Sequence, residues 1–186
     1  MKITSQKTAY EGRFLRIVEK SVNNSRGIKG VWESIERTNV QGRGAVIIIA
    51  ITAEGELILE KNWRPPIESY VIQFPAGLTD VPGEEEKETA RRELLEETGY
   101  LAGELIPVMS VPLAPALAAT HAMHYFAPGV EFKGKTADKD IEEIEVVKIK
   151  LAHVADYLLN LPPDVELDLR VPGILWIMQK RGLIQE

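Results

Sequence analysis

Alternating apolar and polar residues mark the beginning of the chain as β-structure. Residues 14–18 and 30–36 both show this period of two, and the turn-rich stretch 23–27 separates them. A pair of strands joined in this way predicts a hairpin. We therefore expect an N-terminal antiparallel β-strand subdomain over residues 1–42.

The remainder of the chain, residues 43–186, mixes short apolar runs with amphipathic segments. The runs predict buried strands, and a longer charged segment that ends before Gly99 predicts a helix. Pro162 and Pro163 separate two further helices near the end. The predicted strands are 44–50, 57–60, 70–74, 106–111, 121–127 and 143–150, and the predicted helices are 85–98, 151–161 and 171–180. This order favours an α/β (α+β) fold, an α/β/α sandwich with a mixed sheet.

Composition limits the chemistry and the partners. The 186 residues contain no cysteine and three histidines, so a metal would be held mainly by oxygen, as Mg²⁺, Mn²⁺ and Ca²⁺ are. A net charge of −6 argues against general binding of nucleic acid or anionic lipid. The longest apolar run, 45–51, is too short to cross a bilayer, and no secretory signal is visible. We expect a cytoplasmic protein.

Three glutamates in the predicted helix provide candidate metal ligands. Glu93, Glu96 and Glu97 stand at i, i+3 and i+4, on one helix face, and Arg92 can pair with Glu96 one turn away. Crowded carboxylates repel one another, and a divalent cation removes that repulsion. The alternative is an ordinary solvated face of a charged helix.

The surroundings of this helix resemble the Nudix box. The matching residues are Gly77, Glu84, Arg92, Glu93, Leu94, Glu96, Glu97, Gly99 and Tyr100. One departure is a loop of six residues, 78–83, where the family has five. The resemblance implies a divalent cation, Mg²⁺ with Mn²⁺ as a possible substitute, held by Glu93, Glu97 and the Ala76 carbonyl oxygen. Glu96 would complete or support that site.

The chain also resembles the ADP-sugar diphosphatase, or ADP-ribose pyrophosphatase, branch of that family. The similar stretches are 31–38, 61–66 and 74–77. The resemblance implies a homodimer with exchanged N-terminal strands and a set of substrate-binding residues. Trp32 and Phe14 would stack on the base, Glu33 would hydrogen bond to it, and Arg37 and Arg64 would hold the diphosphate. Taken singly, a Trp or Phe in a strand is more often part of the core, and an arginine before a Pro-Pro turn is more often a surface cation.

Two later segments complete the predicted site. Pro115 lies sixteen residues beyond Gly99, where the branch has a proline, so the resemblance places Pro115 and Leu117 beside the terminal sugar. Alanines at 116 and 118 replace the glycine and serine common in the branch, which leaves the sugar open. The branch also has a general-base glutamate in a later loop. Glu142 and Glu143 are the candidates, and strand alternation cannot choose between them.

These features together predict a Mg²⁺-dependent enzyme that hydrolyses the diphosphate linkage of nucleoside diphosphate sugars such as ADP-ribose. The products would be a nucleoside monophosphate and a sugar phosphate. One alternative is hydrolysis of another nucleotide: a dinucleoside polyphosphate, a reduced nicotinamide dinucleotide or an oxidised nucleoside triphosphate. A second alternative, from another functional class, is a module that senses a nucleotide without cleaving it.

Overall fold

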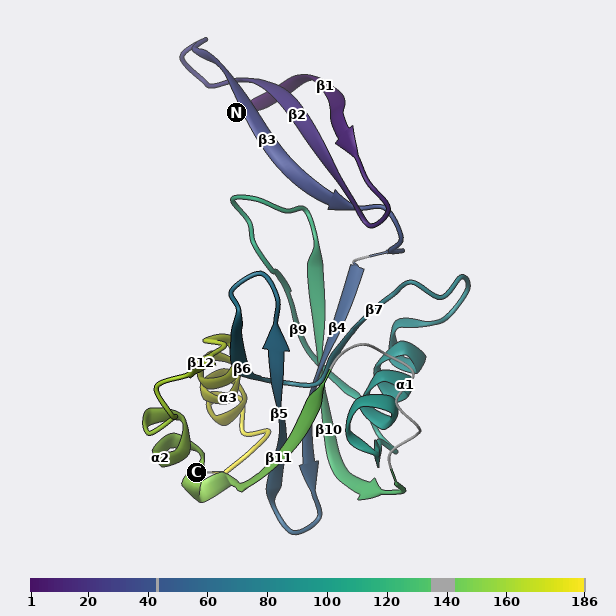
Figure 1. Ribbon diagram of the computed structural model, residues 1–186, viewed down its shortest axis with the longest axis vertical. Helices are drawn as coiled ribbons and strands as arrows, with labels where there is room; N and C mark the ends of the chain where they lie inside the picture. Colours follow the sequence, from purple (N-terminus) through teal and green to yellow (C-terminus); the bar gives the residue numbers. More distant parts are fainter. Residues whose placement is uncertain (43, 135–142, 186) are drawn as a thin grey trace.

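A computed structural model describes residues 1–42, 44–134 and 143–185. The chain begins with a separate antiparallel sheet of β1 (Lys2–Glu11), β2 (Leu15–Asn23) and β3 (Lys29–Arg37), which lies beyond one end of the core (Figure 1). The predicted hairpin corresponds to β2 and β3. Strand β1 was not predicted, because every one of its residues is exposed and no apolar face marks it.

The core is built on a second, mixed sheet. Its main path runs β12-β6-β5-β4-β10-β8, with β7 paired to β4, β9 to β10 and β11 to β5. Strand β4 pairs parallel with β10 and antiparallel with β5, which makes the sheet mixed as predicted. The strands are β4 (Gly44–Thr52), β5 (Glu56–Arg64), β6 (Ser69–Gln73), β7 (Ala76–Leu78), β8 (Tyr100–Leu101), β9 (Ile106–Pro112), β10 (His121–Phe132), β11 (Ile144–Lys150) and β12 (Val165–Leu167).

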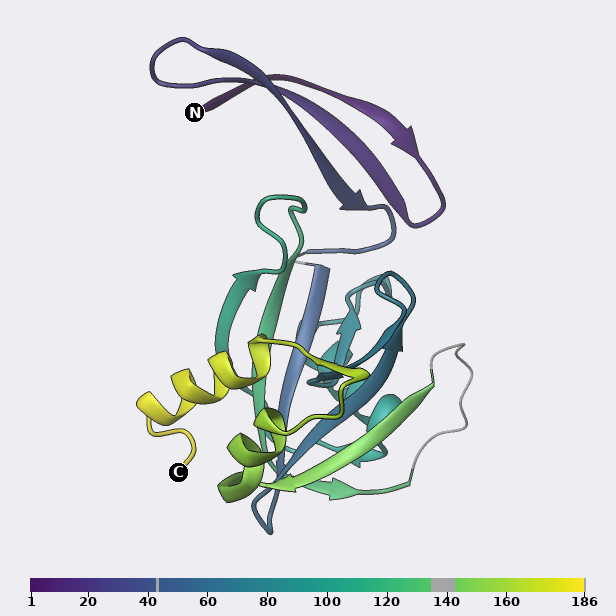
Figure 2. The same cartoon turned by 60° about the vertical axis from the view of Figure 1, so that its left-hand side comes forward.

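Helices cover both faces of this sheet (Figures 1 and 2). The helices are α1 (Glu86–Thr98), the 3-10 turn η1 (Leu151–His153), α2 (Val154–Leu159) and α3 (Arg170–Lys180). Alternate residues of the fully buried β4 point to opposite faces of the sheet. Ile47 belongs to the cluster packed on α3, and Ile48 to the cluster packed on α1. The predicted α/β/α sandwich is confirmed.

The ends of several elements follow local chemistry, although some elements differ from the predicted bounds, such as β5 and β10, which run on to Arg64 and Phe132. Gly99 ends α1 in the left-handed conformation at φ 77°, and its N–H donates to the Leu95 carbonyl oxygen, as expected of a helix C-cap. The helix predicted for 151–161 is a 3-10 turn followed by α2, which stops at Leu159. Strands β7, β8 and β12 were not predicted, since strands of two or three residues leave no readable period. No helix in the described part of the chain is long and apolar enough to cross a membrane.

The packing of α1 on the sheet gives a stability prediction. Leu94 is fully buried between α1 and the sheet. Leu94→Ala should lower the free energy of unfolding by about 2–5 kcal/mol, because it leaves a cavity. Leu159→Ala, at a side chain 83% exposed, should stay within about 0.5 kcal/mol. Urea unfolding measures both, and equal effects would show that α1 is not packed as described.

Candidate active site

The three glutamates of α1 differ in burial. The Glu93 side chain is 16% exposed and that of Glu96 50% exposed, while Glu97 is partly buried. The i, i+3, i+4 spacing therefore places two carboxylates towards the sheet and one towards solvent. That arrangement is not an ordinary solvated helix face.

Strand β7 approaches α1 so closely that only glycine fits between them. A Cβ atom on Gly77 would lie 2.1 Å from Cγ of Glu93. One residue earlier, the Ala76 N–H donates a 3.1 Å hydrogen bond to Oε2 of Glu97. Ala76 and the two inward carboxylates, all predicted metal ligands, are thus brought together by a strand that sequence reasoning did not predict.

Arg92 organises the acidic groups around the helix. Its guanidinium binds Glu84 through two 3.0 Å hydrogen bonds, Glu93 at 2.9 Å and Glu96 at 3.1 Å. The Thr89 hydroxyl also donates to Glu84, at 2.8 Å. The hydrogen bond from Arg92 lowers the pKa of Glu84. Glu84 therefore ties the six-residue loop to α1, and the extra loop residue does not displace it from Arg92.

The inward carboxylates are disfavoured as anions when no cation is present. Burial raises the pKa of Glu93 to about 7, even though Arg92 acts in the opposite direction. Burial raises the pKa of Glu97 by more than that of Glu93, and the neighbouring Glu60 carboxyl group adds to the effect. Glu60 is itself fully buried on β5. Ionising these acids together needs a compensating positive charge.

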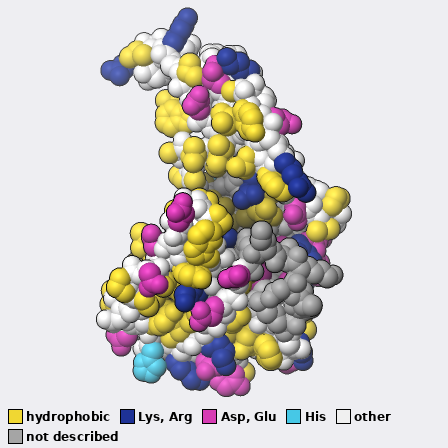
Figure 3. Space-filling view, in the orientation of Figure 1, with side chains coloured by type: hydrophobic (Ala, Val, Ile, Leu, Met, Phe, Trp, Pro, Cys, Tyr) yellow, Lys and Arg dark blue, Asp and Glu magenta, His cyan; other side chains and the backbone are white. Residues whose placement is uncertain are grey.

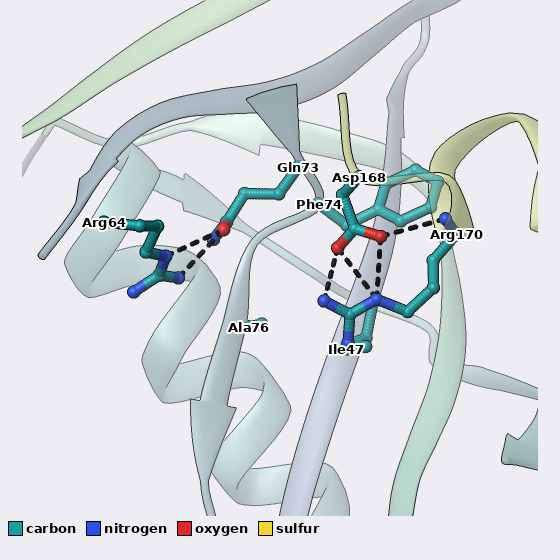
Figure 4. Close-up of a pocket in the computed structure, with 7 residues that line it drawn as sticks. All are labelled: Ile47, Arg64, Gln73, Phe74, Ala76, Asp168 and Arg170. Carbon is teal, nitrogen blue, oxygen red and sulfur yellow. Dashed lines mark hydrogen bonds and ion pairs between the residues drawn. The ribbon is translucent and has the colours of Figure 1, made fainter. Parts of the chain in front are cut away.

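A small cavity of about 40 Å³ lies beside this cluster (Figure 4). Arg64, at the end of β5, lines it and donates hydrogen bonds of 3.0 and 2.9 Å from Nε and Nη2 to Oε1 of Gln73. Arg170 lines it on the other side, where its Nε donates to Asp168 at 2.8 Å. The lining comes from the central sheet and from the start of α3: Ile47, Arg64, Gln73, Phe74, Ala76, Asp168 and Arg170.

The predicted base and sugar residues meet at a different place. Trp32 on β3 is 48% exposed, and its Nε1–H donates a 3.0 Å hydrogen bond to the Ala116 carbonyl oxygen. The N–H of Ile35 donates to the carbonyl oxygen of Leu117 at 2.8 Å. Strand β3 thus contacts the segment that contains Pro115 and Leu117 within one chain.

The other predicted binding residues lie on the N-terminal sheet or in its turns. Phe14 follows the turn after β1, is 52% exposed, and has the Arg13 guanidinium 4.8 Å from its ring centre. Glu33 and Arg37 are exposed on β3. Of the two candidate bases, Glu143 is exposed just before β11, and Glu142 lies outside the described residues.

The donor set fits a hard divalent cation. Within the described ranges, no three acidic, histidine or cysteine side chains already stand at ligand spacing. The Glu93 carboxylate instead accepts a hydrogen bond from the Arg92 guanidinium, and the Glu97 carboxylate accepts one from the Ala76 N–H. Mg²⁺ usually takes only one or two carboxylates and completes its shell with water and phosphate oxygens. Two buried carboxylates that need positive charge, next to a backbone without a Cβ atom, meet that requirement.

Sequence reasoning missed Glu60, Gln73, Asp168 and Arg170. Glu60 and Gln73 are single polar residues in or beside apolar strand runs, which is a weak sequence signal. A charged residue such as Glu60 inside an apolar run could have strengthened it. Asp168 and Arg170 lie far along the chain from the box. Only the pairing of β12 with β6 brings them to the cavity.

Comparison with known proteins identifies the family of this chain. The model of the NUDIX domain family matches residues 41–169, which is most of the chain. The chain therefore belongs to the Nudix family, whose members generally depend on a divalent metal. It is a Nudix pyrophosphohydrolase, similar to ADP-ribose and ADP-sugar pyrophosphatases.

Individual relatives cover nearly the whole chain. It is 29% identical over 184 residues to ADP-ribose pyrophosphatase of Bacillus subtilis, covering 99% of this chain and 95% of that protein. It is 31% identical over 156 residues to the ADP compounds hydrolase NudE of Escherichia coli, covering 84% and 81%. The crystal structure of an ADP compounds hydrolase, 27% identical, matches with a TM-score of 0.80 over 98% of this chain and 96% of that one.

The raised pKa of Glu93 gives a pH prediction for protein stripped of divalent cations. The folded value of about 7 lies above the ordinary 4.5, so the folded state holds the proton more tightly than the unfolded state. The resulting stabilisation is full below about pH 4.5 and is lost as pH rises through about 7.

Thermal unfolding in EDTA should therefore show a midpoint that falls across this range, and Glu93→Gln should flatten the fall. Glu166→Gln, at an exposed position of β12, is the control and should leave the slope unchanged. A slope equally steep in Glu93→Gln would refute the assignment.

Proposed function

We propose that this protein hydrolyses the diphosphate linkage of nucleoside diphosphate sugars, with ADP-ribose as the leading candidate, in a Mg²⁺-dependent reaction. The observation that carries the proposal is the convergence of two partly buried glutamates of α1 on the backbone of β7, beside a cavity lined by arginine. Names of the similar proteins support the substrate class, since they include ADP-ribose pyrophosphatase and ADP compounds hydrolase.

In this proposal Glu93, Glu97 and the Ala76 carbonyl oxygen hold the cation, and Glu96 supports them. Bound Mg²⁺, or Mn²⁺ in its place, supplies Lewis-acid stabilisation of the diphosphate charge and a more acidic water. Arg92 keeps Glu93 and Glu96 in place through its hydrogen bonds. A general base, Glu142 or Glu143, takes the proton of the attacking water.

The substrate is held by cationic and aromatic groups. Arg64 and Arg37 bind the diphosphate, because planar guanidinium donors suit phosphate oxygens. Trp32 and Phe14 stack on the base, and Glu33 hydrogen bonds to it. Pro115 and Leu117 border the terminal sugar.

Residues 1–42 then act as a dimerisation and base-binding subdomain, and residues 43–186 as the hydrolase domain. We propose that the protein is a cytoplasmic homodimer whose two subunits exchange their N-terminal strands. Apolar side chains gather on the N-terminal sheet and at its junction with the core (Figure 3). Those exposed by more than a third include Ile3, Tyr10, Phe14, Leu15, Val31 and Trp32. An uncovered apolar surface of this kind favours a partner, here a second copy of the chain.

Removing a cation ligand should remove turnover while the fold survives. Glu93→Gln or Glu97→Gln should lower kcat more than tenfold at saturating Mg²⁺, a loss above about 1.4 kcal/mol in the activation barrier. Glu88→Gln, at an exposed position on the same helix, is the matched control. Phosphate release from ADP-ribose, other nucleoside diphosphate sugars and dinucleotides measures the effect, and a variant keeping more than a tenth of kcat would refute the assignment.

The base assignment predicts that Glu142→Gln or Glu143→Gln lowers kcat with little change in KM or in cation affinity. A base acts in the transition state and not in ground-state binding. Glu145→Gln, which loses the ion pair with Lys61, controls for loss of charge in this segment. Ordinary rates in both single variants and in the double variant would place the base elsewhere.

Exchanged strands predict that mixing damaged subunits restores activity. Trp32→Ala should raise KM more than it lowers kcat, because stacking is worth about 1–3 kcal/mol in both ground and transition states. In a dimer of one Trp32→Ala subunit and one Glu97→Gln subunit, shared sites would leave one of the two active sites free of both substitutions. Recovered low-KM activity supports exchange, whereas monomers by sedimentation or mixed dimers without recovery would refute it.

A further inference from the structure

A hydrogen-bonded connection runs beneath the candidate active site between β5 and β6. Glu60 and Gln73 stand opposite each other in these antiparallel strands, and both are buried, at 0% and 6% exposure. The Gln73 Nε2–H donates to Oε2 of Glu60 at 3.4 Å. On its other side, Oε1 of Gln73 accepts both hydrogen bonds from Arg64. Figure 4 shows the Arg64 end of this connection beside Ala76.

The connection continues from Glu60 to the carboxylate helix. The Glu60 carboxyl group interacts with that of Glu97 closely enough to raise the pKa of Glu97. The Glu97 carboxylate also accepts a hydrogen bond from the Ala76 N–H. Arg64, Gln73, Glu60 and Glu97 therefore form one series of buried polar contacts across β5, β6 and α1. Polar contacts are strong in a low-dielectric interior, so each member restricts the position of the next.

The amide of Gln73 suits this place because it has opposite polarity at its two ends. Its oxygen meets a guanidinium, which only donates, and its nitrogen meets a carboxyl group, which accepts. A glutamate at 73 would repel Glu60, and an apolar side chain would leave Arg64 and Glu60 without this contact. The amide also has a fixed distance between its two ends, so that movement of either neighbour is transmitted to the other.

We propose that Gln73 and Glu60 are positioning residues that couple Arg64, which holds the diphosphate, to Glu97, which holds the divalent cation. This inference rests on the proposed function for the roles of Arg64 and Glu97. Neither Gln73 nor Glu60 needs to touch substrate or metal. The coupling means that the affinity of the cation site depends on Arg64 even when no substrate is present.

Binding of Mn²⁺ alone to the full chain tests the coupling without turnover. Gln73→Met keeps the volume and removes both hydrogen-bonding ends, so it should weaken Mn²⁺ binding by about 10–100-fold. Arg64→Met should also weaken Mn²⁺ binding in the wild-type background. If the two residues were independent, losing a nearby positive charge would leave Mn²⁺ binding unchanged or make it tighter.

A double-mutant cycle separates coupling from general damage. In the Gln73→Met background, Arg64→Met should have no further weakening effect, because the connection is already broken. Thr52→Val is the matched control: Thr52 is buried at the far end of β4, and its hydroxyl accepts from the Glu56 N–H. This variant should lower the unfolding midpoint without changing the Mn²⁺ affinity.

Substitutions of Glu60 keep the test decisive if Gln73→Met does not fold. Glu60→Gln preserves an acceptor for Gln73 and a donor for Glu97, so the effect of Arg64→Met should persist, whereas Glu60→Leu should abolish it. Unchanged Mn²⁺ affinity in folded Gln73→Met, or an undiminished Arg64→Met effect in the Gln73→Met or Glu60→Leu background, would overturn the proposal. Coupling without hydrolysis of any nucleoside diphosphate sugar would instead refute the proposed function alone.

Discussion

The close contact between β7 and α1 is the constraint on which the rest of the site depends. Glu93 occupies the space that a Cβ atom on Gly77 would fill, and the neighbouring Ala76 N–H binds Glu97. Both glutamates are thereby held against backbone, where burial makes their negative charge unfavourable without a cation. The Nudix sequence pattern can be understood from this contact: it needs a glycine on the strand and acidic residues one turn apart on the helix.

Around that contact, the polar groups of the core satisfy one another in two connected sets. Arg92 binds the outer acids of the box, and Gln73 links Arg64 to the buried Glu60. Both sets place guanidinium groups near carboxylates, some of which the sheet and α1 partly shield from water. Hydrogen bonds to the backbone of β7 and to these arginines restrict the positions of the carboxylates before any ligand binds.

The N-terminal sheet has a different physical character. Its three strands contact the rest of the chain mainly through β3, where Trp32 and Ile35 hydrogen bond to the loop between β9 and β10. Its first strand is exposed throughout, and several large apolar side chains on the sheet face solvent. A sheet of this kind is poorly stabilised alone and gains stability from a further surface, which is the physical basis for the proposed exchange of strands.

The sequence by itself determined the sandwich, α1 with its end at Gly99, and the acidic face with Arg92, because apolar period, helix capping and i, i+4 spacing are local properties. Only the tertiary structure decided that β7 exists, that Glu84 pairs with Arg92, and that Gln73 links Arg64 to the buried Glu60. It also brought Asp168 and Arg170 to the cavity beside Ala76. These features depend on strand register and on contacts between distant segments, and no local pattern records which residues a β-sheet will place opposite each other.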